Sequence, residues 1–88
     1  MAAREFEYVT IQLLGLSNSG KTGRFAVTNR KSNDVLGVIV WYGPWRQYAF
    51  APTTEYATVY SPGCLRDIAD FLRETTDEHR EKARAAQS

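Results

Sequence analysis

The sequence has few of the residues from which disulfides and metal sites are built. Its 88 residues include one cysteine, Cys64, and one histidine, His79. A single cysteine cannot form an internal disulfide, and these two residues cannot supply the three or four ligands of a zinc site. We therefore expect neither a metal nor a cofactor.

Long hydrophobic runs and an excess of one charge are also absent. The 11 basic and 10 acidic residues leave a net charge of +1, which excludes a polyanionic nucleic-acid mimic and a strongly cationic coat for the phosphate backbone. No apolar run approaches the roughly 18 residues of a membrane span. The first residues, MAAREFEY, lack the apolar stretch of a signal peptide. These features favour a cytoplasmic protein without a membrane partner.

The residues that are present are sufficient for one small core. Hydrophobic residues make up 43% of the chain and aromatic residues 12%, which is too apolar for a disordered protein. A chain of this length forms one domain at most. We predict a flexible N-terminus at 1–5, a single α+β domain at 6–75, and a polar C-terminal helical extension or tail at 76–88.

Alternation of apolar and polar residues predicts an antiparallel sheet. Val9, Ile11 and Leu13 alternate with polar neighbours, as in a half-buried strand. Residues 35–42 are apolar on both sides, which is typical of a central or doubly covered strand. Strands are predicted at 8–13, 24–28, 35–42, 45–51 and 56–60.

After residue 60 the period of the pattern changes to that of a helix. Ser61 is a candidate N-cap, and Pro62 suits the first helical position. Apolar residues then recur at spacings of three and four, which predicts one buried stripe composed of Cys64, Leu65, Ile68, Ala69, Phe71 and Leu72. The predicted fold is α+β, an antiparallel β-meander of about five strands with one C-terminal helix packed on one face.

The segment Gly15–Thr22, GLSNSGKT, matches the expression for a phosphate-binding P-loop. Such a loop must open a helix whose amides hold the phosphates, whereas the residues after it read as a strand. We interpret the segment as a hairpin loop in which Lys21 can touch a phosphate. Cys64 and His79 lie about four helical turns apart and cannot form a nucleophile and base pair. We therefore predict that the protein is not an enzyme.

Residues 41–50 hold five aromatic residues and Arg46 around one tight turn. The rings either fill the core of a small sheet or form a platform on which bases stack while the guanidinium pairs with phosphate. Residues 21–50 carry five basic side chains and one acidic one, a balance of +4, whereas residues 62–88 carry five basic and six acidic ones. The predicted ligand residues are Trp45, Arg46 and Tyr48, with Lys21, Arg30 and Lys31 as phosphate contacts.

The runs WYGPWRQY at 41–48 and CLRDIADF at 64–71 resemble small proteins encoded by bacteriophages and prophages. The resemblance is carried by residues 36–52 and 64–72. It implies an accessory protein of a mobile element, active in phage takeover or counter-defence in the cytoplasm of a bacterial host. It implies no catalytic residues.

The sequence leaves two functions open. The first is a non-enzymatic binding protein whose exposed sheet face engages a nucleic acid or a small nucleotide. The alternative is a protein-interaction module that docks a host protein through the same face. Because one helix covers one side of a sheet, and residues 35–42 are apolar on both sides, we also expect a homodimer.

Overall fold

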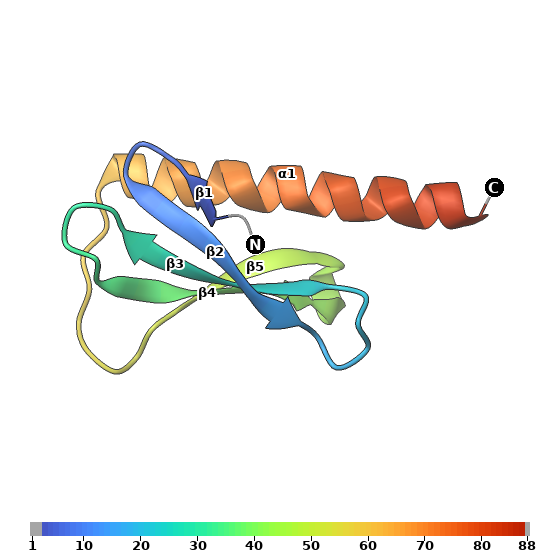
Figure 1. Cartoon of the computed structure of the whole chain (residues 1–88), viewed down its shortest axis with the longest axis horizontal. Helices are drawn as coiled ribbons and strands as arrows, with labels where there is room; N and C mark the ends of the chain where they lie inside the picture. Colours follow the sequence, from blue (N-terminus) through green and yellow to red (C-terminus); the bar gives the residue numbers. More distant parts are fainter. Residues whose placement is uncertain (1–2, 88) are drawn as a thin grey trace.

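The computed structural model describes residues 3–87, which form one antiparallel sheet with one long helix along it (Figure 1). The elements are β1 (Ala3–Glu5), β2 (Val9–Leu16), β3 (Gly23–Asn29), β4 (Val35–Tyr42), the 3-10 turn η1 (Gly43–Trp45), β5 (Gln47–Pro52) and α1 (Pro62–Gln87). Each strand pairs with its neighbour in sequence, in the order β1-β2-β3-β4-β5. The predicted α+β meander with a C-terminal helix is confirmed.

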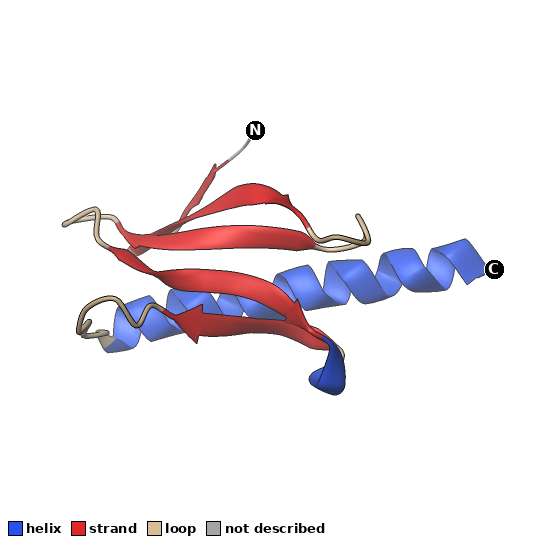
Figure 2. Ribbon diagram, turned by 90° about the horizontal axis from the view of Figure 1, so that it is seen from below, coloured by secondary structure: helices blue, strands red, loops and turns tan. Residues whose placement is uncertain are grey.

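The two faces of the sheet differ in what covers them. The face that packs against α1, called the inner face here, holds the core: Val9 and Ile11 of β2, Val27 of β3, Ile39 of β4 and Tyr48 of β5 are all buried. Among residues 3–87, no helix or strand lies over the opposite, outer face, which Figure 2 shows from below. Strict alternation along β2 explains why Val9 and Ile11 share the inner face.

A local irregularity in β4 changes which residues face the helix. Val27 pairs with Gly37 but Thr28 pairs with Val35, so Leu36 is an extra residue in the ladder. Strict alternation along residues 35–42 predicts that Leu36 lies on the face opposite Ile39, whereas both are buried in one core. This expectation was wrong because a bulge changes the side-chain phase of a strand.

The start of the described chain also differs from the prediction. Residues 3–5, expected to be loose, form β1 and pair with β2. Arg4 donates to Glu74 of α1 at 2.7 Å and lies 4.6 Å over the Phe6 ring; its hydrogen bond lowers the pKa of the Glu74 carboxyl. No local sequence pattern predicts this contact, because Arg4 and Glu74 are 70 positions apart.

Residues 56–60, predicted as a strand, are irregular. The Tyr60 hydroxyl donates to the carbonyl oxygen of Leu36, and the Tyr56 hydroxyl donates to that of Val35. Val59 is 91% exposed. The aromatic residues that resembled a strand pattern instead fasten this crossing segment to the start of β4.

The helix begins as predicted, with the Cys64 amide donating to the Ser61 hydroxyl at 3.2 Å. Cys64, Ile68 and Phe71 are buried. Leu65, predicted in the buried stripe, is 52% exposed, and Asp67 takes the inward position beside Ile68. The Asp67 carboxylate accepts a hydrogen bond from the backbone N–H of Tyr8 at 2.8 Å. The inward face of the helix therefore includes a buried polar residue that the apolar pattern did not predict.

Helix α1 continues to Gln87, the helical one of the two forms considered for 76–88, and its last turns extend beyond the sheet (Figure 1). The structure has overall dimensions of 44 × 26 × 24 Å. None of the described helical segments has the length and hydropathy needed to span a bilayer.

Thr76 joins α1 to the edge strand β5. Its hydroxyl accepts the buried backbone N–H of Tyr48 at 3.0 Å, a group with no neighbouring strand to bond. We expect Thr76→Val to lower the free energy of unfolding by about 1–3 kcal/mol, because the N–H is left buried without a partner. Urea denaturation measures the change. The matched control is Thr75→Val, expected to change stability by about 0.5 kcal/mol or less; equal effects would contradict a specific role for Thr76.

Candidate functional site

The predicted ligand residues lie at two opposite ends of the sheet, because successive turns of a meander lie at opposite ends. Phe25 pairs with Ile39 in antiparallel strands, so the loop before β3 and the turn after β4 lie at one end, and the turn between β3 and β4 lies at the other (Figure 1). Lys21, Trp45 and Arg46 share the first end. The seven residues of β3 separate the ends by about 23 Å.

Arg30 and Lys31 lie at the second end. The Arg30 guanidinium donates to the carbonyl oxygen of Phe6 at 2.7 Å. Lys31 is exposed in a turn whose amides bond to the Asn29 side chain. These two cations therefore do not converge with Arg46 on one small ligand.

Tyr48 is not on an exposed face. It is 6% exposed, its hydroxyl accepts the backbone N–H of Gly23 at 3.0 Å, and its ring packs edge-on against Phe25 and Trp41. Tyr48 thus fills the core and fastens the start of β3. The expectation that it faces a ligand was wrong because alternation leaves the choice of face open.

The turn between β4 and β5 holds Arg46 in an unusual backbone conformation. Arg46 has φ 52° and ψ 47°, the left-handed region that costs about 1 kcal/mol or more for a residue with a Cβ. Two hydrogen bonds hold it: its N–H donates to Gly43 at 3.0 Å, and its carbonyl accepts from the Arg80 guanidinium at 3.0 Å. The Arg46 side chain is thereby set at the rim of the turn.

Trp41 and His79 form the wall between this turn and the helix. Their ring centroids are 4.5 Å apart with an interplanar angle of 47°. The charged neighbours of His79 in the sequence are typical of a solvated surface residue, whereas His79 is half-buried. Spacings of three and four continued from Ile68 through Thr76 reach position 79. The helical period therefore predicts that His79 lies on the inward face of α1, although its neighbours in sequence are polar.

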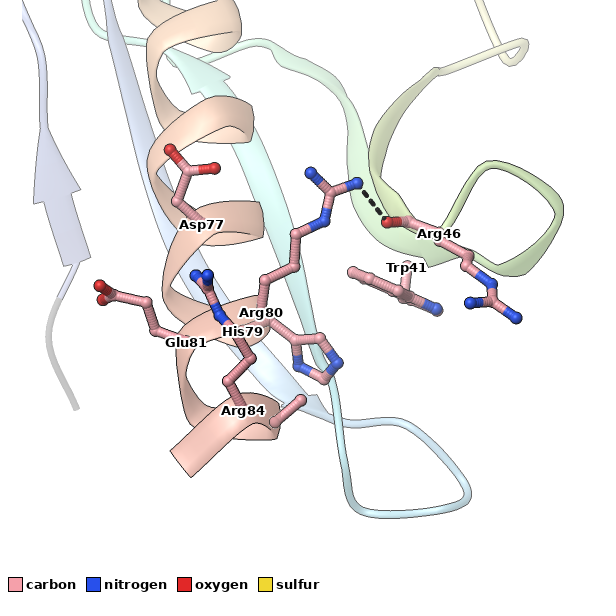
Figure 3. Close-up of a pocket in the computed structure, with 8 residues that line it drawn as sticks. Trp41, Arg46, Asp77, His79, Arg80, Glu81 and Arg84 are labelled. Atoms are coloured by element: carbon pink, nitrogen blue, oxygen red, sulfur yellow. Dashed lines mark hydrogen bonds between the residues drawn. The ribbon is translucent and has the colours of Figure 1, made fainter. Parts of the chain in front are cut away.

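Beside these rings lies an open groove of about 810 Å³. Its walls are made by Trp41, Arg46, Asp77, His79, Arg80, Glu81, Ala83 and Arg84. Figure 3 shows His79 and Arg80 on the side of α1 that faces Trp41 and the turn, with Asp77 and Glu81 pointing to the other side. The groove wall next to the turn is therefore aromatic and basic.

Trp45 extends this wall onto the tip of the turn. It is 63% exposed, and its ring packs edge-on against Tyr42 at a centroid distance of 4.8 Å. Together, Trp41, Trp45, Arg46, His79 and Arg80 form what we call the turn-end surface. Such a set offers planar rings for stacking and guanidinium groups for an anion.

The Gly15–Thr22 segment does not have the geometry of a P-loop. Gly23 begins strand β3 rather than a helix. Backbone amides in the loop are engaged internally: Gly20 donates to the Ser17 carbonyl at 2.9 Å, and Thr22 to the Ser17 hydroxyl at 3.4 Å. The loop presents the exposed Lys21 side chain but no cradle of amides aimed at phosphates.

Among residues 3–87, no group of three or more His, Cys, Asp or Glu side chains is placed to hold a metal ion. Cys64 is buried in the first turn of α1. It contributes to the core beside Ile68, as expected of a small apolar side chain.

Comparison with known proteins gives one informative similarity. The chain is 31% identical over 61 residues to an uncharacterised 9.3 kDa protein of Acholeplasma phage L2; the match spans 69% of this chain and 76% of the phage protein. No family model and no solved structure matches the chain. The resemblance to small phage-encoded proteins is thus confirmed at the level of origin.

Proposed function

The chain belongs to the same family as the 9.3 kDa protein of Acholeplasma phage L2, and from this premise we propose a non-enzymatic phage accessory protein that binds a nucleotide-bearing ligand at its turn-end surface. The ligand chemistry is a planar base joined to a phosphate. Either a single-stranded nucleic acid or a small nucleotide carries it.

The main support is the conformation of Arg46. A left-handed arginine is energetically unfavourable and persists only where the surroundings impose it; such positions cluster at binding and active sites. Here Arg80 reaches from α1 to the Arg46 carbonyl and maintains the turn. Glycine would occupy this position without strain, so stability alone does not explain an arginine whose side chain is exposed.

The neighbouring rings supply the second half of the recognition. Trp45 is exposed next to Arg46, and a base stacked on an aromatic ring contributes about 1–3 kcal/mol. The exposed Lys21 lies at the same end of the sheet and can add a phosphate contact. Arg30 and Lys31, at the far end, are excluded from this site unless a strand of nucleic acid runs the length of the molecule.

Binding rather than turnover is favoured by the Ser17–Thr22 loop. Its amides bond within the loop, so no backbone cradle is positioned to stabilise a phosphate in transfer. Sequestration of a nucleotide-bearing ligand in the bacterial cytoplasm fits the counter-defence role that a phage setting favours.

The test separates the side chain of Arg46 from the fold. In Arg46→Gly, the turn keeps its left-handed residue at lower conformational cost, so the melting temperature should stay the same or rise. Binding of a labelled single strand of about 12 nucleotides, followed by fluorescence anisotropy, should weaken about 10- to 100-fold as a charge-assisted contact is lost. Calorimetry measures the affinity for mononucleotides. Binding of a mononucleotide indicates a small ligand, and binding of the strand alone indicates a nucleic acid.

The matched control is Arg66→Ala. It removes one exposed arginine of α1 that lies about 21 Å along the helix axis from Arg80, towards the start of the helix. It should leave affinity within about twofold, since it lowers net charge without touching the turn. Affinity for the strand should also fall between about 50 and 200 mM salt. Equal losses in both variants, or no binding of strand or mononucleotide at about 1 mM, would contradict the proposal.

A further inference from the structure

The outer face of the sheet is apolar at its centre. Ala26 of β3 pairs with Val38 of β4, which pairs with Ala51 of β5, and Val40 pairs with Ala49. These five residues lie on the face opposite the core residues with which they alternate. Polar residues, Gln12 and Thr28 among others, occupy the same face towards β2. No element among residues 3–87 covers this face (Figure 2).

Two exposed residues at opposite ends of this face, Arg24 and Glu55, carry charges of opposite sign. Arg24 precedes the inward-facing Phe25, so alternation sets it on the outer face at the end near η1. Glu55 follows β5 at the opposite end, where it lines a surface hollow with Val38 and Ala51. The centre between them carries no charged side chain.

From this arrangement we propose that the outer face binds a second copy of the chain, sheet against sheet, with the strands of the two copies running in opposite directions. A two-fold axis across the strands lays the Arg24 end of one copy over the Glu55 end of the other, twice by symmetry. The small central side chains allow two sheets to approach to about 10 Å.

The size of the face is sufficient for such a pair. Four strands spaced about 4.8 Å apart and six to eight residues long project roughly 400–500 Å² per copy. Two copies would bury about 1,000 Å² in total, the lower limit for a specific interface. This predicts a homodimer with a dissociation constant in the micromolar range, and it leaves the groove between α1 and the turn on the other side of the sheet.

Sedimentation of the full chain over a concentration series tests the assembly. The protein should reach twice the monomer mass of 10.0 kDa at about 100 μM. Val38→Glu should raise the dissociation constant at least tenfold, because it buries a carboxylate in the interface. The control Val59→Glu changes a valine that is 91% exposed outside the face and should remain dimeric.

Charge reversal tests the orientation without placing a charge in the centre of the face. Arg24→Glu and Glu55→Arg should each raise the dissociation constant several-fold, because each places like charges near one another at both overlapping ends of the dimer. A chain that carries both changes should have the dissociation constant of the unmodified protein. Circular dichroism checks that each variant is folded.

A mass of 10.0 kDa at every concentration would overturn the proposal and leave the face to a different protein. Dimers unaffected by Val38→Glu would also overturn it. If the double variant did not recover the dissociation constant of the unmodified protein, the proposed opposite orientation of the two copies would be overturned. None of these outcomes bears on nucleotide binding, which is measured on the monomer site by Arg46→Gly.

Discussion

Gly37→Ala is expected to be the most damaging single-methyl change in the protein. A Cβ at this position would lie 2.3 Å from the carbonyl oxygen of Ala51 and 2.8 Å from the Cα of Pro52. Both atoms belong to the backbone of β5, which pairs with β4 at this point. Relief therefore requires the two strands to separate, unlike a clash with a flexible side chain.

The expected loss in the free energy of unfolding is about 3 kcal/mol, the upper end of the usual cost of overpacking, because the neighbours are backbone atoms. In a domain of this size that corresponds to a fall in melting temperature of roughly 12–24 °C. Thermal denaturation followed by circular dichroism measures it. Gly15→Ala is the matched control, because a Cβ there has no atom within 4 Å. Similar melting temperatures for Gly37→Ala and the unmodified chain would contradict the close approach of β4 and β5.

Phe71→Ala is expected to have an effect at least as large. Phe71 is 7% exposed and packs edge-on against Phe25 and Phe6 at centroid distances of 5.0 and 6.3 Å. It is therefore the ring that joins α1 to β3 and to the segment after β1. Truncation of a buried phenylalanine costs about 3–5 kcal/mol through lost burial and the cavity left behind.

Urea denaturation should show this as a lower midpoint with an unchanged slope, provided the denatured state is unaffected. The informative control is Leu65→Ala, a residue that the sequence pattern also assigned to the buried stripe. Because Leu65 is 52% exposed, its truncation should cost less than about 1 kcal/mol. If Leu65→Ala destabilised the protein as much as Phe71→Ala, the helix would be rotated relative to the sheet from the orientation described here.

The candidate site was only partly accessible from the sequence. The density of aromatic residues at 41–50 directed attention to the β4–β5 turn, and the role of Trp45 and Arg46 in binding stays a prediction. Composition could not separate Tyr48, which is buried, from Trp45, which is exposed. Nor could it bring His79 and Arg80 to the turn, since they are more than thirty positions away from Trp41 and Arg46.

The sequence by itself determined the elements that depend on local signals. Alternation marked the paired segments around Val9 and Val27, and a continuous apolar run marked the one around Ile39. Ser61 with Pro62 marked the start of the helix. These signals are local, because period and capping act within a few residues. A meander also follows from strands joined by short turns. These features sufficed for the α+β class.

Only the tertiary structure decided what depends on contacts between distant segments. The bulge that turns Leu36 inward arises from pairing with β3, β1 is held by Arg4 on Glu74, and Asp67 is buried because the Tyr8 amide needs an acceptor. The grouping of ligand candidates at opposite ends likewise follows from strand direction. In each case the determining energy is that of a partner far along the chain, which no local window of residues contains.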